Sequence, residues 1–209
     1  RVEAHRVCRN LTLDASDNLM RAIERQDLVE DLERILFDDP CGPIILVGRE
    51  GVGKTAIIHE VIRRHRAARP HDPGDRLQHV WEIDPLRVVS GMRIVGMWQQ
   101  RLFSILEHIR TRLRRDHNVP LSDILYVSNP VALLRTGRAA GSSMTLSDVL
   151  IPFLQDRDFS FITEATPTEW SRIQEIDRRF SDLFEVIRVP EPSSDQAWRM
   201  ILRSRTDLE

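Results

Sequence analysis

The sequence has little lysine, little cysteine and no long apolar run. Lys54 is the only lysine among the 30 basic residues, and all the others are arginine. The cysteines, Cys8 and Cys41, are too few and too far apart for a disulfide framework or a CxxC metal site. A membrane-spanning helix needs about 18 consecutive apolar residues, and no such run exists. The net charge of −2 gives no basis for binding nucleic acid by bulk electrostatics.

The length and composition are those of one folded domain with a sizeable core. The chain has 209 residues, of which 41% are hydrophobic and 30% are charged. It begins at Arg1 rather than Met and shows no signal peptide. We therefore expect a piece of a longer protein, in a reducing, cytoplasmic setting.

Short apolar runs alternate with helical patterns along the chain. This alternation predicts an α/β fold, a five-stranded parallel sheet between helices. We expect residues 1–21 to form a polar N-terminal segment and residues 22–209 to form the domain. The expected strands are 44–47, 79–83, 124–127, 159–162 and 186–189. The expected helices are 22–36, 54–66, 96–115, 146–154, 168–184 (either continuous or broken once) and a last one after Ser193.

A phosphate-binding motif follows the first predicted strand. Residues 48–55, GREGVGKT, match G-x-x-x-x-G-K-T between an apolar strand and a helix. Glycines let the backbone N–H groups face an anion, and the helix N-terminus adds its positive dipole end. Lys54 would reach the β- and γ-phosphates, and Thr55 would bind Mg²⁺. A chance glycine-rich turn is the alternative. The predicted nucleotide-binding residues here are Gly48, Glu50, Gly51, Val52, Gly53, Lys54, Thr55 and Ala56.

The acids that a hydrolytic P-loop enzyme usually carries at the end of a neighbouring strand are missing. The strand 124–127 is followed by Ser128 and Asn129, which carry no charge. Ser128 can hydrogen-bond a metal-bound water, but the amide of Asn129 is not basic and takes no proton. Asp123 begins the same strand, roughly 13 Å from its far end at about 3.3 Å per residue, so it cannot substitute.

Taken in order, these segments resemble the AAA+ family, and more narrowly the first ATPase module of Clp-type unfoldases and disaggregases. The resemblance covers residues 11–202. Residues 22–25, AIER, resemble the family's V-I-G-R segment, which implies that Ile23 packs on adenine and that Glu24 replaces a glycine. Ser128 and Asn129 fall on the two Walker B acids, and Thr166 falls on the sensor threonine.

The resemblance implies a fold, ligands and partners. The five strands would take the order 5-1-4-3-2, and the family's small helical lid would not be included in these residues. ATP and Mg²⁺ would be the cofactors, with Mg²⁺ held through Thr55. The module would assemble into a homo- or hetero-oligomeric ring, expected to be a hexamer, that acts on a protein substrate. Ile94 and Val95 fall on the pore loop, where the family has an aromatic residue.

The arginine-finger positions also depart from the family. In an ungapped reading they fall on Asp182 and Leu183, and an aspartate there would repel a neighbouring subunit's γ-phosphate. Arg178 and Arg179 spell the finger sequence one helical turn earlier. These arginines are either displaced fingers or solvated helix charges.

Two further signals leave alternatives open. Glu164 ends the predicted strand next to the missing acids, so it is either a displaced catalytic base or an ordinary strand-end carboxylate. Met97 and Trp98 either grip a translocating peptide or anchor the long helix in the core.

Three functions compete at this stage. The first is an ATP-binding module with impaired hydrolysis, in which nucleotide supports ring assembly or regulation. The second is an active protein-remodelling motor that uses substitute catalytic residues. The third is a P-loop scaffold or switch that recruits partner proteins.

Overall fold

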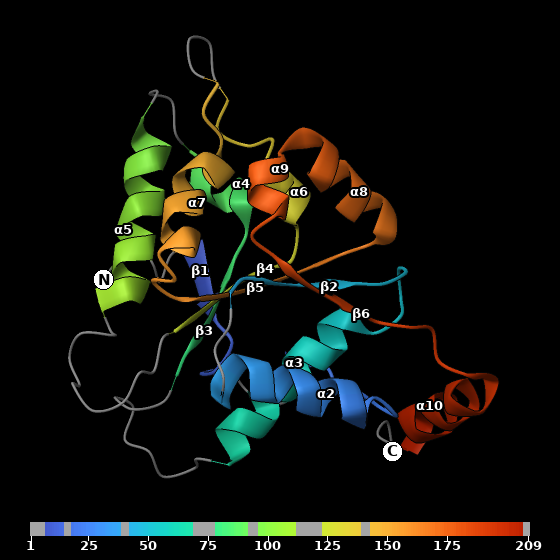
Figure 1. Ribbon diagram of the computed structural model, residues 1–209. Coiled ribbons are helices and arrows are strands. Elements are labelled where there is room, and N and C mark those ends of the chain that lie inside the picture. The colour runs from blue at the N-terminus through green and yellow to red at the C-terminus, as the bar shows by residue number, and fades with distance from the viewer. Residues whose placement is uncertain are drawn as a thin grey trace.

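The computed structural model describes residues 7–14, 18–38, 42–68, 78–91, 96–111, 123–138 and 143–206. Its centre is a six-stranded sheet in the order β1-β3-β4-β5-β2-β6 (Figure 1). The strands are β1 (Cys8–Asn10), β2 (Ile44–Val47), β3 (Val80–Ile83), β4 (Ile124–Val127), β5 (Ser160–Ala165) and β6 (Glu185–Arg188). The helices are α2 (Gln26–Glu33), the π-helix η2 (Arg34–Asp38), α3 (Lys54–Ala67), α4 (Pro85–Val89), α5 (Met97–Thr111), α6 (Pro130–Leu133), α7 (Leu146–Gln155), α8 (Pro167–Ile176), α9 (Arg178–Ser181) and α10 (Ser194–Thr206).

Helices cover both faces of the sheet, because successive residues of a strand point to opposite sides. In β2, Ile44 and Leu46 join an apolar cluster with α2 and α3, whereas Ile45 and Val47 join a second cluster with α5 and α7. Figure 1 shows α2 and α3 on one face and α4 to α9 on the other. The predicted α/β class is confirmed.

The five predicted strands are parallel and lie in the predicted order, but the expected count of five is wrong. A sixth strand, β1, pairs antiparallel with β3 at the edge of the sheet, with Cys8 opposite Ile83. The backbone N–H of Leu11 donates to the Val80 carbonyl at 2.9 Å and extends this pairing. Three residues are too few to show an alternating pattern, so part of the predicted N-terminal segment belongs to the sheet without a sequence signal.

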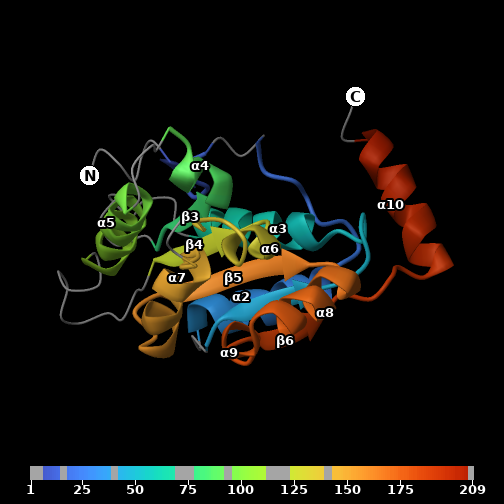
Figure 2. The ribbon, with the colours of Figure 1, turned by 90° about the horizontal axis from the view of Figure 1, so that it is seen from above.

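The last helix, α10, stands apart from the layered core (Figure 2). Its Trp198 is 66% exposed and its Leu202 is 60% exposed. Two ion pairs tie α10 to the segment before α2. Glu24 accepts from Arg203 at 2.9 Å and from Arg199 at 3.3 Å.

Candidate nucleotide-binding site

The phosphate loop joins β2 to α3 and needs glycine at three positions for two reasons. Gly51 and Gly53 have φ angles of 74° and 98°, the left-handed region that other residues rarely adopt. A Cβ on Gly48 would lie 2.7 Å from the Val189 carbonyl oxygen, so this strand end can pack against β6 only as glycine. No side chain caps the N-terminus of α3. Its first backbone N–H groups therefore suit an anion.

Lys54 lies inside this loop. Its Nζ donates to the carbonyl oxygens of Gly48 at 2.9 Å and Arg49 at 3.0 Å, and the residue is 9% exposed. The loop thus folds around the ammonium group, where phosphate oxygens can replace the carbonyls as acceptors. The sequence prediction of Lys54 as a phosphate ligand fits this position.

Next to it, Thr55 contacts a carboxylate from a different strand. The Thr55 hydroxyl lies 2.8 Å from Oε1 and 2.9 Å from Oε2 of Glu164 in β5. The Tyr126 hydroxyl in β4 donates to Glu164 Oε1 at 2.5 Å. Burial, followed by the charge of Glu164, raises the pKa of Tyr126 well above its usual range, so the phenol keeps its proton. Sequence reasoning did not identify Tyr126 as a site residue, because its contact with Glu164 depends on the order of the strands.

The residues that follow β4 make no such contact with the phosphate loop among the contacts described. Ser128 and Asn129 are both exposed, and the Asn129 side chain accepts from the Ala132 N–H at 3.2 Å as the N-cap of α6. Asp123, at the start of β4, is buried and accepts from the His79 N–H at 3.0 Å and from Trp81 Nε1 at 2.9 Å. As expected, Asp123 is occupied at the far end of the strand.

A cavity of about 300 Å³ lies beside the loop and combines three parts of the chain. Ile23, predicted to contact adenine, lines it together with the phosphate loop and α10. The lining residues are Arg21, Ala22, Ile23, Arg25, Gly51, Val52, Gly53, Ala56, Pro192, Met200 and Ile201. Arg25 is buried, and its Nη2 donates to the Val52 carbonyl at 3.2 Å. The cavity thus has mixed apolar and backbone walls, suited to a nucleobase next to a phosphate site.

Thr166 begins α8 directly after β5. Its hydroxyl accepts from the Glu169 N–H at 3.2 Å, and its backbone N–H donates to the Glu169 carboxylate at 2.7 Å; these two bonds form a capping box. This arrangement explains why a threonine followed by Pro167 starts a helix here. Its sensor role stays a prediction.

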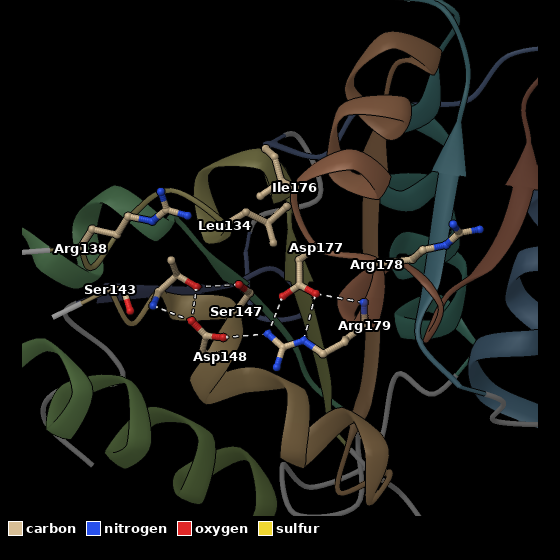
Figure 3. Close-up of a pocket in the computed structure, with 10 residues that line it drawn as sticks. Leu134, Arg138, Ser143, Ser147, Asp148, Ile176, Asp177, Arg178 and Arg179 are labelled. Carbon is tan, nitrogen blue, oxygen red and sulfur yellow. Dashed lines mark hydrogen bonds and ion pairs between the residues drawn. The ribbon is translucent and has the colours of Figure 1, made fainter.

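The arginines of α9 line a different pocket, of about 490 Å³ (Figure 3). Arg179 reaches between two acids, with Nη2 at 3.1 Å from Asp177 and at 3.3 Å from Asp148, while Arg178 points away from them. The Asp177 carboxylate raises the pKa of Arg179. Asp182 is exposed at the end of α9. Arg179 therefore has partners within its own chain, and a finger role for either arginine stays a prediction.

The structure describes some of the other predicted functional residues. Ile94 and Val95 of the predicted pore loop lie outside the described residues. Trp98 is 5% exposed and belongs to the core, as its alternative interpretation held, whereas Met97 is 44% exposed. Within the described ranges, His, Cys, Asp and Glu side chains form no group suited to holding a metal by themselves, and no helix is long and apolar enough to cross a bilayer.

Known proteins provide an independent comparison. No protein-family model matches the chain. ClpB of Lactococcus lactis subsp. cremoris is 25% identical over 179 residues, which cover 85% of this chain and 20% of that protein. Chloroplastic ClpC1 of Oryza sativa subsp. japonica is 27% identical over 208 residues, covering 95% of this chain and 21% of that protein. The chain thus spans about a fifth of the length of these relatives.

The fold also has solved counterparts. Saccharomyces cerevisiae Hsp104, in an extended-conformation complex with casein, superposes with a TM-score of 0.73 at 23% identity, over 96% of this chain and 32% of Hsp104. This match shows the fold of an AAA+ large subdomain. Together with the sequence similarity, it supports homology to the ClpB and Hsp104 group of nucleotide-binding AAA+ chaperones.

Proposed function

We propose that this chain is an ATP-binding AAA+ module of a Clp-like protein, of the first-module kind, in which hydrolysis is impaired. One observation carries the proposal. The phosphate loop is complete, with Lys54 buried inside it, whereas β4 is followed by Ser128 and then by Asn129, an amide that caps α6. Such a site holds a triphosphate and lacks a base for the attacking water.

The position of Glu164 agrees with this assignment. Both of its carboxylate oxygens lie within 2.9 Å of the Thr55 hydroxyl, and Tyr126 donates to one of them. This carboxylate is therefore on the metal side of the site. The predicted alternative of a displaced base would require it to contact the attacking water instead.

Nucleotide would then act as a structural ligand. A ligand that binds only the native state stabilises it by about 2.7 kcal/mol at a hundredfold excess over Kd, enough to control an assembly equilibrium. By analogy with the relatives, we propose a ring of six subunits that engages a protein substrate, with other modules supplying the work. A cytoplasmic location is part of the same proposal, although one relative is chloroplastic.

A working motor is the second candidate, because a carboxylate, that of Glu164, does lie beside the phosphate loop. If Glu164 serves as a base, Glu164→Gln should abolish a measurable turnover of ATP. If turnover is near background in both proteins, Glu164 has no such role. A scaffold without unfolding activity would differ from both by tolerating serine at Ile94 and Val95.

Equilibrium binding of a fluorescent ATP analogue to the purified chain tests the proposal. We expect Lys54→Ala to weaken binding about 10- to 100-fold, since a charge-assisted hydrogen bond contributes about 1.5–3 kcal/mol. Arg34→Ala is the control, because Arg34 is an exposed cation on η2 that pairs with Asp31. Failure of the unaltered chain to bind any adenine nucleotide at millimolar concentration would contradict the proposal.

A further inference from the structure

Glu164 is a buried carboxylate that accepts hydrogen bonds from hydroxyl groups. It lies opposite Leu46 in the register between β5 and β2, on the same face as Tyr126 and α3. The residue is 9% exposed. Among the described residues, two hydroxyl groups contact it and no arginine or lysine pairs with it. Buried charges in proteins are normally paired or coordinate metal ions, so this carboxylate calls for a cation.

The directions of the hydrogen bonds to Glu164 indicate where that cation would bind. A threonine hydroxyl has one proton and two lone pairs, and a carboxylate only accepts. Thr55 therefore gives its proton to Glu164, and its oxygen lone pairs are left for another partner. Tyr126 also donates to Glu164, so the carboxylate takes both hydroxyl protons, and the Thr55 oxygen lone pairs can face a cation.

The donor set suits a hard divalent cation. Mg²⁺ prefers oxygen ligands, keeps several waters and is usually held by one or two carboxylates together with substrate phosphates. Thr55 and Glu164 meet at the N-terminus of α3, where the phosphate loop ends. The residues present therefore fit the Mg²⁺ that accompanies a bound nucleotide.

We infer that Glu164, from β5, supplies the carboxylate of the Mg²⁺ site that the residues after β4 do not supply. It orients the Thr55 hydroxyl toward the metal ion and accepts hydrogen bonds from metal-bound water. Tyr126 is a positioning residue that fixes Glu164 Oε1. This inference rests on the proposed function, because the metal ion is the partner of a bound nucleotide.

The test is nucleotide affinity measured with Mg²⁺ and with EDTA, for the whole chain and for Glu164→Gln. The unaltered chain should bind a fluorescent ADP analogue more tightly with Mg²⁺. Glu164→Gln should have the same nucleotide affinity as the unaltered chain in EDTA. With Mg²⁺ its affinity should be about 10- to 100-fold lower than that of the unaltered chain, the usual effect of losing a group that orients a metal ligand. Tyr126→Phe should show a smaller loss of affinity with Mg²⁺.

Glu185→Gln is the matched control, since Glu185 is an exposed carboxylate on β6, which is separated from β5 by β2; the gain of this variant from Mg²⁺ should be unchanged. Mn²⁺ paramagnetic resonance in the presence of ADP gives a second readout, and circular dichroism checks that each variant folds. An equal gain from Mg²⁺ in Glu164→Gln and the unaltered chain would overturn the inference alone. Absence of nucleotide binding in both conditions would overturn the proposed function and the inference with it.

Discussion

Asn129 follows β4 and Glu164 lies near the end of the neighbouring strand β5, but their side chains make different contacts. Asn129 points to the first turn of α6, and Glu164 points to the first turn of α3. Since α3 follows the phosphate loop directly, Glu164, and not Asn129, has the position that our proposal for the metal ion needs. This difference is the reason for our proposal that the site favours binding over hydrolysis.

Asn129→Ala should therefore lower stability and leave nucleotide binding unchanged. Loss of an N-cap asparagine costs about 1 kcal/mol, and the bond lost is that from the Ala132 N–H. Thermal unfolding and nucleotide affinity check the two expectations, and Asn129→Asp, which keeps the cap, serves as the control. A tenfold loss of affinity without loss of stability would show that Asn129 acts in the site.

His59 makes stability depend on pH near neutrality. Burial first, and then the charge of Arg9, lower the pKa of His59, whose Nδ1 accepts from the Met20 N–H at 3.2 Å. The folded state therefore favours the neutral ring. This stabilisation is complete above the unfolded pKa of about 6.5 and is lost as pH falls through the lower folded value.

Comparison of His59→Gln with the unaltered chain isolates this contribution. We expect the free energy of unfolding of the unaltered chain to fall more steeply between pH 7 and pH 5, with an excess slope of at most about 1.4 kcal/mol per pH unit. Urea unfolding at several pH values provides the measurement. Parallel pH profiles for the two proteins would rule out the role of His59.

At the scale of elements, two ion pairs join α10 to a residue whose backbone is strained. Glu24 has a φ of 58°, where the resembling family has glycine, and its carboxylate pairs with Arg199 and Arg203. The backbone keeps a conformation suited to glycine, while the side chain binds a helix that lines the nucleobase cavity.

Replacing Glu24 in two ways separates the ion pairs from the strain. Glu24→Gln and Glu24→Gly should both speed hydrogen exchange in α10, because each removes the carboxylate. Glu24→Gly should also raise the stability of the core by up to about 1 kcal/mol, since glycine adopts this φ without cost. Hydrogen-exchange mass spectrometry and thermal unfolding measure the two effects. Exchange in α10 that is unchanged in both variants would contradict this function of the ion pairs.

The elements that the sequence predicts best are those with long, regular patterns. The apolar run of β2 and the helix α3 appear within one residue of their predicted bounds. The predicted helical region 168–184, for which a break was one alternative, is divided into α8 and α9 at Asp177. The extended backbone of Asp177 and its side-chain bonds to the Arg179 and Phe180 N–H groups start the second helix. The short helices α4 and α6 were missed, because a few residues carry no detectable period.

The site was predictable only where its residues are adjacent in sequence. The phosphate loop is a contiguous motif, so Lys54 and Thr55 follow from the sequence. The contact between Thr55 and Glu164 joins residues 109 positions apart and exists only because β5 lies between β2 and β4. Sequence reasoning placed Glu164 near the site, but its partner and orientation depend on strand order.

At the scale of the whole molecule, the nucleotide should control stability and assembly together. We expect Mg-ATP to raise the melting temperature of the unaltered chain, since binding at a hundredfold excess over Kd stabilises the native state by about 2.7 kcal/mol. The melting temperature of Lys54→Ala should not change. Sedimentation velocity of the full-length protein should show larger assemblies with nucleotide than without. Assemblies of the same size with and without nucleotide would show that ring formation does not depend on nucleotide binding.

Single-turnover hydrolysis of radiolabelled ATP bound to the purified chain, with Mg²⁺ present, tests the central claim most directly. A filled phosphate loop without a base predicts that bound ATP is recovered intact, at a rate of loss close to that of Lys54→Ala. Rapid conversion of bound ATP to ADP, dependent on Lys54, would contradict it.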